Sequence, residues 1–158
     1  MSILTIGEKA PDFQLTASNG KQVKLSDYVG QQVVLYFYPR NMTPTCTKQA
    51  CQMRDYNSQF ATYNTVVLGV STDPIASHQR FIEKHELPFL LLADEDHSVA
   101  EQYGVWQLKK LYGREYMGLV RSTFLIDTEG KLAQQWLKVR LNGHVEEVVE
   151  AAKTLVTT

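Results

Sequence analysis

Only two cysteines occur in this sequence, no apolar run is long, and neither sign of charge is in excess. With 16 Lys and Arg against 17 Asp and Glu, the formal net charge is −1. Such a chain is a poor candidate for binding nucleic acid or an anionic membrane. No apolar stretch approaches the roughly 18–20 residues of a membrane span, and residues 1–13 lack the charged and apolar regions of a signal peptide. We therefore expect a cytoplasmic protein without a nucleic-acid or membrane partner.

The length and the composition indicate one globular domain spanning residues 1–158. A chain of this size buries roughly two-thirds of its unfolded surface, so it needs no disulfide or metal to fold. In the reducing cytosol, two cysteines close in sequence are more often catalytic, redox-sensing or metal-binding than structural. The cysteine pair is therefore the first candidate for a functional site.

Apolar patterning predicts an α/β protein, because continuous apolar runs alternate with amphipathic helical patterns. The pattern predicts strands at residues 33–39, 65–71 and 87–93, antiparallel pairs at 12–25 and 122–139, and helices at 43–63, 73–85, 96–104 and 142–156. Asp73 is expected to cap the helix that begins at Pro74. Buried strands alternating with helices indicate an α/β sandwich, to which an N-terminal hairpin and a later one add antiparallel strands.

Both cysteines lie in the segment YPRNMTPTCTKQAC, residues 38–51. The dipeptide Thr43-Pro44 predicts a helix start, because Thr can cap a helix and Pro fits its first turn. Cys46 then lies in the first turn, directly after the carboxyl end of a strand, where ligands bind in open α/β sheets. Unpaired N–H groups and the positive end of the helix dipole favour a thiolate there. The sequence therefore predicts that Cys46 is a nucleophile.

Cys51 follows on the same predicted helix, where five residues correspond to a turn of roughly 140° and a rise of about 7.5 Å. The two Cα atoms would then lie roughly 8–9 Å apart, beyond the ~7 Å limit for a disulfide, so pairing requires the helix to unwind. This suggests a sulfenic acid at Cys46 that later condenses with Cys51. The alternative is that both cysteines are small, inert apolar residues. A zinc site is disfavoured, since no C-x-x-C or suitably spaced His pair accompanies them.

The segment resembles the active-site segment of the peroxiredoxins, whose signature Pro-x-x-x-Thr-x-x-Cys corresponds to Pro39, Thr43 and Cys46. The second cysteine five residues later resembles the bacterioferritin-comigratory, or Q-type, branch. Seven segments resemble that branch in the same order: GEKAPDFQL, VVLYFYP, GVSTD, LPFLLLAD, VAEQYGVW, YGREYMG and RSTFLID. The resemblance implies a thioredoxin-like fold, with a central mixed sheet flanked by helices.

The resemblance also implies a thiol peroxidase that reduces hydrogen peroxide and organic hydroperoxides without a metal or other cofactor. Cys46 would be the peroxidatic cysteine and Cys51 the resolving cysteine. Thr43 would hold the peroxide and the thiolate, Pro39 would shield the pocket from water, and Arg121 would turn toward Cys46. The reductant would be thioredoxin or a similar dithiol. We expect a monomer or a weak dimer.

These roles agree with the chemistry, because attack of a thiolate on an O–O bond develops negative charge on the leaving oxygen. Arg121 and the N–H groups of the first helical turn are donors suited to that charge. The alternative for Arg121 is a surface ion pair. Alternatives for the whole chain are a redox sensor that uses the same disulfide and a thioredoxin-like binding module without catalysis.

Two residues depart from the branch. Thr45 stands where glycine is usual, which predicts a slightly narrower pocket. Gln49 stands where glutamate is frequent, which removes a charge near both thiols and favours the thiolate form of the nucleophile.

Three other features have ordinary interpretations. Basic and aromatic residues at 108–121 are typical of a nucleic-acid patch, but the net charge and the resemblance favour a loop bordering the active site. Residues 94–97, DEDH, are interpreted as an acidic turn that caps the next helix rather than as metal ligands. Trp106 and Trp136 are interpreted as packing residues.

Overall fold

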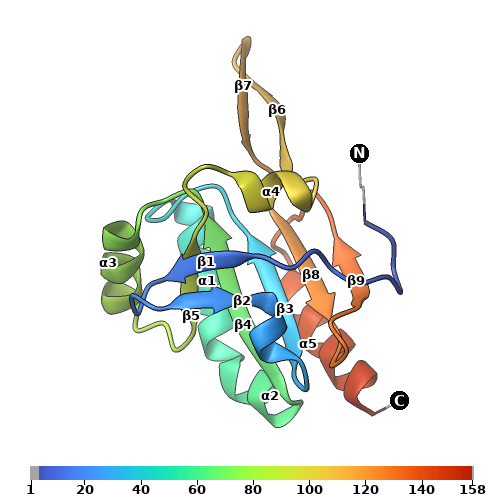
Figure 1. Cartoon of the computed structure of the whole chain (residues 1–158). Coiled ribbons are helices and arrows are strands. Elements are labelled where there is room, and N and C mark those ends of the chain that lie inside the picture. The colour runs from blue at the N-terminus through green and yellow to red at the C-terminus, as the bar shows by residue number, and fades with distance from the viewer. Residues whose placement is uncertain (1–3, 158) are drawn as a thin grey trace.

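The computed structural model describes residues 4–157. Its main strands are β1 (Gln14–Ala17), β2 (Gln22–Lys24), β3 (Gln32–Phe37), β4 (Thr65–Ser71), β5 (Leu90–Ala93), β8 (Ser122–Ile126) and β9 (Leu132–Trp136). They form one seven-stranded sheet in the order β2-β1-β5-β4-β3-β8-β9 (Figure 1). Strands β3, β4 and β5 are parallel to one another, and the other neighbouring pairs are antiparallel. The predicted mixed sheet with an N-terminal hairpin is confirmed.

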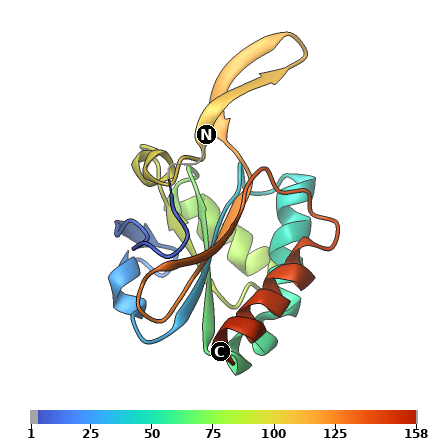
Figure 2. The ribbon, with the colours of Figure 1, turned by 90° about the vertical axis from the view of Figure 1, so that its right-hand side faces the viewer.

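The helices are the 3-10 helix η1 (Leu25–Tyr28) and the α-helices α1 (Pro44–Asp55), α2 (Asn57–Thr62), α3 (Ile75–His85), α4 (Ser98–Gln102) and α5 (His144–Val156). Figure 2 shows α1, α2 and α5 on one face of the sheet and η1 and α4 on the other. Within residues 4–157, no helix is both long enough and apolar enough to span a bilayer.

Each face of the sheet has its own apolar core, because successive residues of a strand point to opposite faces. Val33, Leu35 and Phe37 of β3 pack with residues of η1 and α4. Val34 and Tyr36 pack on the opposite face with residues of α1, α2, α3 and α5. Strand β3 is therefore buried on both sides along its whole length, as its continuous apolar run predicts.

Residues 108–121 are not the predicted loop, because most of them belong to a β-hairpin. Its strands β6 (Trp106–Leu111) and β7 (Arg114–Leu119) form a separate two-stranded sheet that projects from the body of the protein (Figures 1 and 2). The turn between them contains Tyr112 and Gly113, both with positive φ (51° and 76°). The loop was predicted from the family resemblance and the net charge, and the turn was missed, although Gly readily adopts the positive φ that a tight hairpin turn needs.

Two helix starts differ from the prediction. The single helix predicted over 43–63 is divided into α1 and α2 at Tyr56, which has φ −98° and ψ 3°. Asp73 does not cap α3, because Pro74 with its extended backbone (ψ 164°) occupies the N-cap position. The Asp73 carboxylate instead accepts hydrogen bonds from the Asn41 N–H (2.8 Å) and the Ser71 hydroxyl (2.7 Å). Its partners thus lie in the loop after β3 and at the end of β4.

Other predicted features are confirmed. Asp94 caps α4 by accepting hydrogen bonds from the N–H groups of Val99 (3.2 Å) and Ala100 (2.9 Å). The amphipathic helix predicted at 142–156 is α5: Val145, Val148 and Ala152 face the core, whereas Val156 in its last turn is 40% exposed. Trp106 stacks on the imidazole of His97 with ring centroids 4.1 Å apart.

Candidate active site

Cys46 lies in the first turn of α1, directly beyond the carboxyl end of β3, as the sequence predicts. Its side chain is 2% exposed and belongs to the core on the α1 side of the sheet. Thr43 is the N-cap residue, with an extended backbone, and Pro44 occupies the first helical position. Because a helix of this length presents unpaired N–H groups and a positive dipole end at its start, the Cys46 sulfur lies where an anion is stabilised.

The Thr43 hydroxyl does not cap the helix. It donates to the carbonyl oxygen of Arg40 at 2.9 Å, and no side-chain hydrogen bond from Thr43 reaches the helix N–H groups. The intervening Met42 has a positive φ of 64°, which turns the chain back on itself. As a result, the Thr43 hydroxyl does not accept hydrogen bonds from the N–H groups of the first turn, and its oxygen can still accept one from another donor.

Arg121 reaches the same sulfur from a segment 75 residues away in the chain. It immediately precedes β8, and β8 pairs with β3 so that Ser122 lies opposite Phe37. The register therefore places Arg121 at the edge of the sheet where α1 begins. Its Nη2 donates to Cys46 Sγ at 3.3 Å, and its Nη1 donates to Gln49 Oε1 at 2.5 Å. The guanidinium contacts the cysteine rather than forming the alternative surface ion pair.

Gln49 holds the arginine from the next turn of α1 and is fully buried. Its side-chain oxygen Oε1 accepts a hydrogen bond from Arg121, while its Nε2 has no hydrogen-bond partner among the described residues. A neutral partner orients the guanidinium without cancelling its charge. The full positive charge of Arg121 therefore faces Cys46, which supports the interpretation of Gln49 drawn from the sequence.

We expect Gln49→Glu to slow the reaction of Cys46 with hydrogen peroxide about fivefold at neutral pH. A carboxylate at this position offsets the charge of Arg121 and repels the thiolate, which costs about 1 kcal/mol. The measurement is the second-order rate constant by stopped flow. Gln59→Glu, which places the same charge at an exposed position on α2, is the matched control. An equal effect in both variants would contradict the proposed role of the local charge.

A buried polar network fixes the loop between β3 and α1. Asn41 donates from Nδ2 toward His78 Nδ1 (2.9 Å), and Tyr38 Oη donates to Asn41 Oδ1 (2.6 Å). His78 Nε2 lies 3.0 Å from the carbonyl oxygen of Leu92, so it donates there and leaves Nδ1 as the acceptor. Burial lowers the pKa of His78, which keeps the ring neutral in this arrangement. The half-buried Pro39 lies in the segment that this network holds.

Two further side chains belong to the surroundings of Cys46 and were not found from the sequence. Tyr36 is buried behind the site, and burial raises its pKa, as does a thiolate at Cys46. Lys109, in the middle of β6, donates from Nζ to the carbonyl oxygen of Leu119 at the base of the hairpin at 2.7 Å. Burial and the charge of Arg121 lower the pKa of Lys109, whereas Cys46 opposes that shift. A second cation thus lies within electrostatic range of the thiol.

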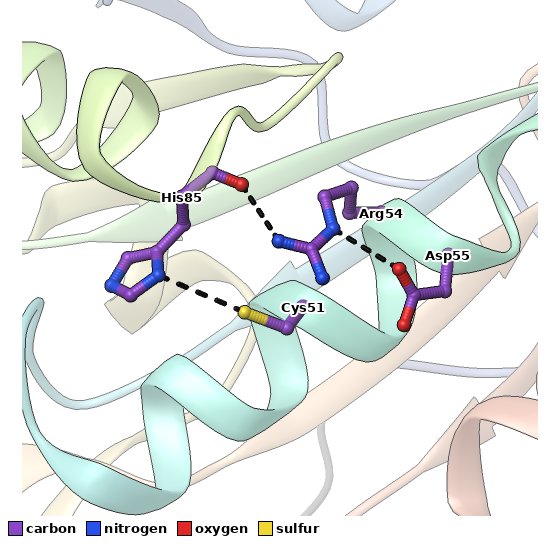
Figure 3. A network of polar contacts seen from close by, with 4 residues as sticks. All are labelled: Cys51, Arg54, Asp55 and His85. Carbon is purple, nitrogen blue, oxygen red and sulfur yellow. Dashed lines mark hydrogen bonds and ion pairs between the residues drawn. The ribbon is translucent and has the colours of Figure 1, made fainter.

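Cys51 lies farther along α1 and is half-buried. Both cysteines are free, and α1 is continuous through them, in agreement with the predicted separation. Cys51 Sγ lies 3.9 Å from Nδ1 of His85, the last residue of α3 (Figure 3). Arg54 donates from Nη1 to the carbonyl oxygen of His85 at 2.8 Å. The second thiol therefore has polar neighbours that the sequence did not indicate.

His144 makes the stability of the protein sensitive to acid. It begins α5, is 4% exposed, and its Nε2 lies 2.9 Å from the Thr123 hydroxyl. Burial, assisted by the charge of Arg121, lowers the pKa of His144 to about 4. In the unfolded chain the ordinary value of about 6.5 applies, so the unfolded state binds more protons between these values. The contribution of neutral His144 to the free energy of unfolding is therefore fully present above about pH 6.5, and it is lost as the pH falls toward 4.

We expect the free energy of unfolding to fall by roughly 2 kcal/mol between pH 6.5 and pH 4 through this residue alone. Urea titrations at several pH values measure this loss. In His144→Gln the same interval should be correspondingly flatter, while the remaining titrating groups are unchanged. Identical pH profiles for the two proteins would show that His144 is not the source.

Comparison with known proteins shows the family to which the chain belongs. Residues 6–135 match the model of the AhpC/TSA family. A peroxiredoxin Bcp of Bacillus subtilis is 52% identical over 152 residues, covering 96% of this chain and 97% of its own. A solved structure of a Xylella fastidiosa PrxQ mutant superposes with a TM-score of 0.92 at 34% identity, covering 98% of each chain. The bacterioferritin comigratory protein of Xanthomonas campestris superposes with a TM-score of 0.89 at 33% identity, covering 99% of each chain.

These relatives share the whole length of the chain and its arrangement of a central mixed sheet between helices, which is the thioredoxin-like fold. The chain belongs to the AhpC/TSA family and is a thiol peroxidase of its Bcp, or Q-type, peroxiredoxin branch.

Proposed function

We propose that this peroxidase uses two cysteines in turn, with Cys46 as the peroxidatic residue and Cys51 as the resolving residue. The observation that carries the proposal is the contact of 3.3 Å between Arg121 Nη2 and Cys46 Sγ at the start of α1. A guanidinium and a helix N-terminus both favour the thiolate form of a nearby cysteine, which is the reactive form.

In the first step, the Cys46 thiolate attacks one oxygen of the peroxide. A sulfur–oxygen bond forms, the O–O bond breaks, and the second oxygen takes a proton and leaves as water or an alcohol. Arg121 stabilises the charge that develops on this oxygen. The Thr43 oxygen accepts a hydrogen bond from the peroxide O–H, since its own proton is committed to Arg40. Pro39 covers the pocket and limits the access of water.

In the second step, the thiol of Cys51 displaces hydroxide from the sulfenic acid of Cys46, which gives a disulfide and water. Because the intact helix keeps the two sulfurs apart, the start of α1 must unwind first. A dithiol reductant such as thioredoxin then restores both thiols by thiol–disulfide exchange. This cycle suits the cytoplasm, where such reductants keep cysteines reduced.

Hydrogen peroxide and small organic hydroperoxides are the proposed substrates. The name of the Xanthomonas campestris structure refers to alkyl peroxide reduction by that protein, which supports the second class. Every residue assigned a role lies in a single chain, so the proposal is compatible with a monomer or a weak dimer.

The proposal is tested by mapping the products of reaction with hydrogen peroxide. In Cys51→Ser, a sulfenic-acid trap should label Cys46. In the unmodified protein, mass spectrometry should find the Cys46–Cys51 disulfide, and thioredoxin with its reductase and NADPH should sustain turnover. Absence of a label on Cys46 in Cys51→Ser would exclude the two-cysteine cycle. A single stoichiometric burst without turnover by any dithiol would instead indicate a redox sensor.

A further inference from the structure

His85 is placed to act on the thiol of Cys51. Its Nδ1 lies 3.9 Å from Cys51 Sγ, a distance at which a thiol can donate a hydrogen bond to a ring nitrogen. The two residues come from different helices, since Cys51 lies within α1 and His85 ends α3. Their proximity therefore depends on how these helices pack.

Several contacts hold this imidazole against the sulfur. The Arg54 guanidinium donates to the His85 carbonyl oxygen at 2.8 Å, and its Nε donates to Asp55 at 3.0 Å (Figure 3). Phe81 also packs edge-on against the ring, with centroids 5.2 Å apart and planes at 78°. Both the backbone and the ring of His85 are thus restrained, so the approach to Cys51 does not depend on a freely rotating side chain.

We propose that His85 is the general base that deprotonates Cys51 when the disulfide forms. The inference rests on the proposed function, in which Cys51 attacks the sulfenic acid of Cys46. With its own proton on Nε2, the neutral ring accepts the thiol proton at Nδ1. The Cys51 thiolate then attacks Cys46 Sγ, the new sulfur–sulfur bond forms, and the sulfur–oxygen bond breaks. The departing hydroxide takes a proton, from the imidazolium or from solvent, and leaves as water.

One cation lies near Cys51 on α1. Arg54 is three residues farther along the helix, and its Nε donates to the Asp55 carboxylate at 3.0 Å, which offsets part of its charge. The hydrogen bond from Arg54 to Asp55 raises the pKa of Arg54, and a Cys51 thiolate and Glu86 raise it further. The proton is therefore assigned to His85, while Arg54 holds the backbone of His85 in place.

The packing of α1 indicates which cysteine moves. Pro44 and Thr45 at its start are exposed, whereas Ala50 and Met53 beside Cys51 are fully buried. The bond from Arg54 to the end of α3 ties down the same half of the helix. The first turn is therefore the part that unwinds, and it carries oxidised Cys46 toward a Cys51 that stays beside His85.

The test is a rapid-mixing measurement of His85→Gln, in which acid quenching and mass spectrometry follow the sulfenic acid and then the disulfide. Because the thiolate and not the thiol is the nucleophile, a base that takes the thiol proton accelerates the attack by roughly 10-fold or more. We expect disulfide formation in His85→Gln to be about 10- to 30-fold slower at pH 7. The deficit should shrink to less than about threefold near pH 9.5, where hydroxide in solution can take the thiol proton in place of His85.

Two controls separate a chemical role from a structural one. His97→Gln changes the N-cap residue of α4, which is far along the chain from Cys51. This variant should form the disulfide at the rate of the unmodified protein. In His85→Ala, added imidazole should restore part of the lost rate, because it replaces the missing base.

An unchanged rate of disulfide formation in His85→Gln would overturn the inference. So would a deficit that is equal at pH 7 and pH 9.5 and does not respond to imidazole, because that pattern indicates altered packing. If the unmodified protein forms no Cys46–Cys51 disulfide, the two-cysteine cycle itself fails. The outcome for the unmodified protein thus distinguishes failure of the proposed function from failure of the role given to His85.

Discussion

Replacing Cys46 by serine is expected to reduce the rate of peroxide reduction at least about a thousandfold, to the level of the buffer. The serine hydroxyl fits the same space but does not ionise near neutral pH, so no sulfur nucleophile remains beside Arg121. Peroxide consumption per mole of protein, with the thioredoxin system present, measures the loss.

Cys51→Ser is the matched comparison, because it removes the other thiol and leaves the environment of Cys46 unchanged. This variant should consume about one equivalent of peroxide rapidly and then stop with thioredoxin as the reductant. Residual turnover in Cys46→Ser above that of the buffer would contradict the assignment of Cys46 as the reacting group.

Replacing Arg121 by methionine is expected to slow the reaction of Cys46 with hydrogen peroxide by about 100- to 1000-fold. The guanidinium contacts Cys46 Sγ directly, and in the proposed mechanism it is the principal cation for the charge on the leaving oxygen. The loss corresponds to about 3–4 kcal/mol of transition-state stabilisation. Stopped-flow measurement of the second-order rate constant, with protein previously reduced, gives this value directly.

Two controls define the cause of that loss. Arg121→Lys keeps a charge but cannot contact both Cys46 and Gln49 as a fork does, so an intermediate loss of about tenfold is expected. Arg140→Met removes an exposed arginine and should leave the rate unchanged. A rate for Arg121→Met within threefold of the unmodified protein would mean that the contact with Cys46 does not contribute to catalysis.

The position of Cys46 could be predicted from the sequence because it depends on local signals. The dipeptide Thr43-Pro44 marks the helix start wherever the segment occurs, and the buried run before it marks β3. The approach of Arg121 depends instead on the pairing of β3 with β8. Only the resemblance to the peroxiredoxins indicated it, since no local pattern connects two residues 75 positions apart.

Polar contacts were the least predictable features. Thr43 and Asp73 both stand next to helix starts, but their side chains bond to Arg40 and to Asn41 in preference to the helix N–H groups. Which partner such an oxygen takes depends on loop geometry that propensities do not describe. The contact between Cys51 and His85 likewise arises from the packing of α1 against α3, which the sequence pattern does not specify.

The central claim is that the fold activates Cys46, and the most direct test compares the reaction of the fully reduced protein with hydrogen peroxide when native and when unfolded in urea. The unfolded protein supplies the rate of an unactivated thiol. We expect a native rate constant at least about a thousandfold higher, with the product mapped as the Cys46–Cys51 disulfide. Equal rate constants in the two states would contradict it, because the contacts of Arg121 and the start of α1 would then confer no reactivity on the sulfur.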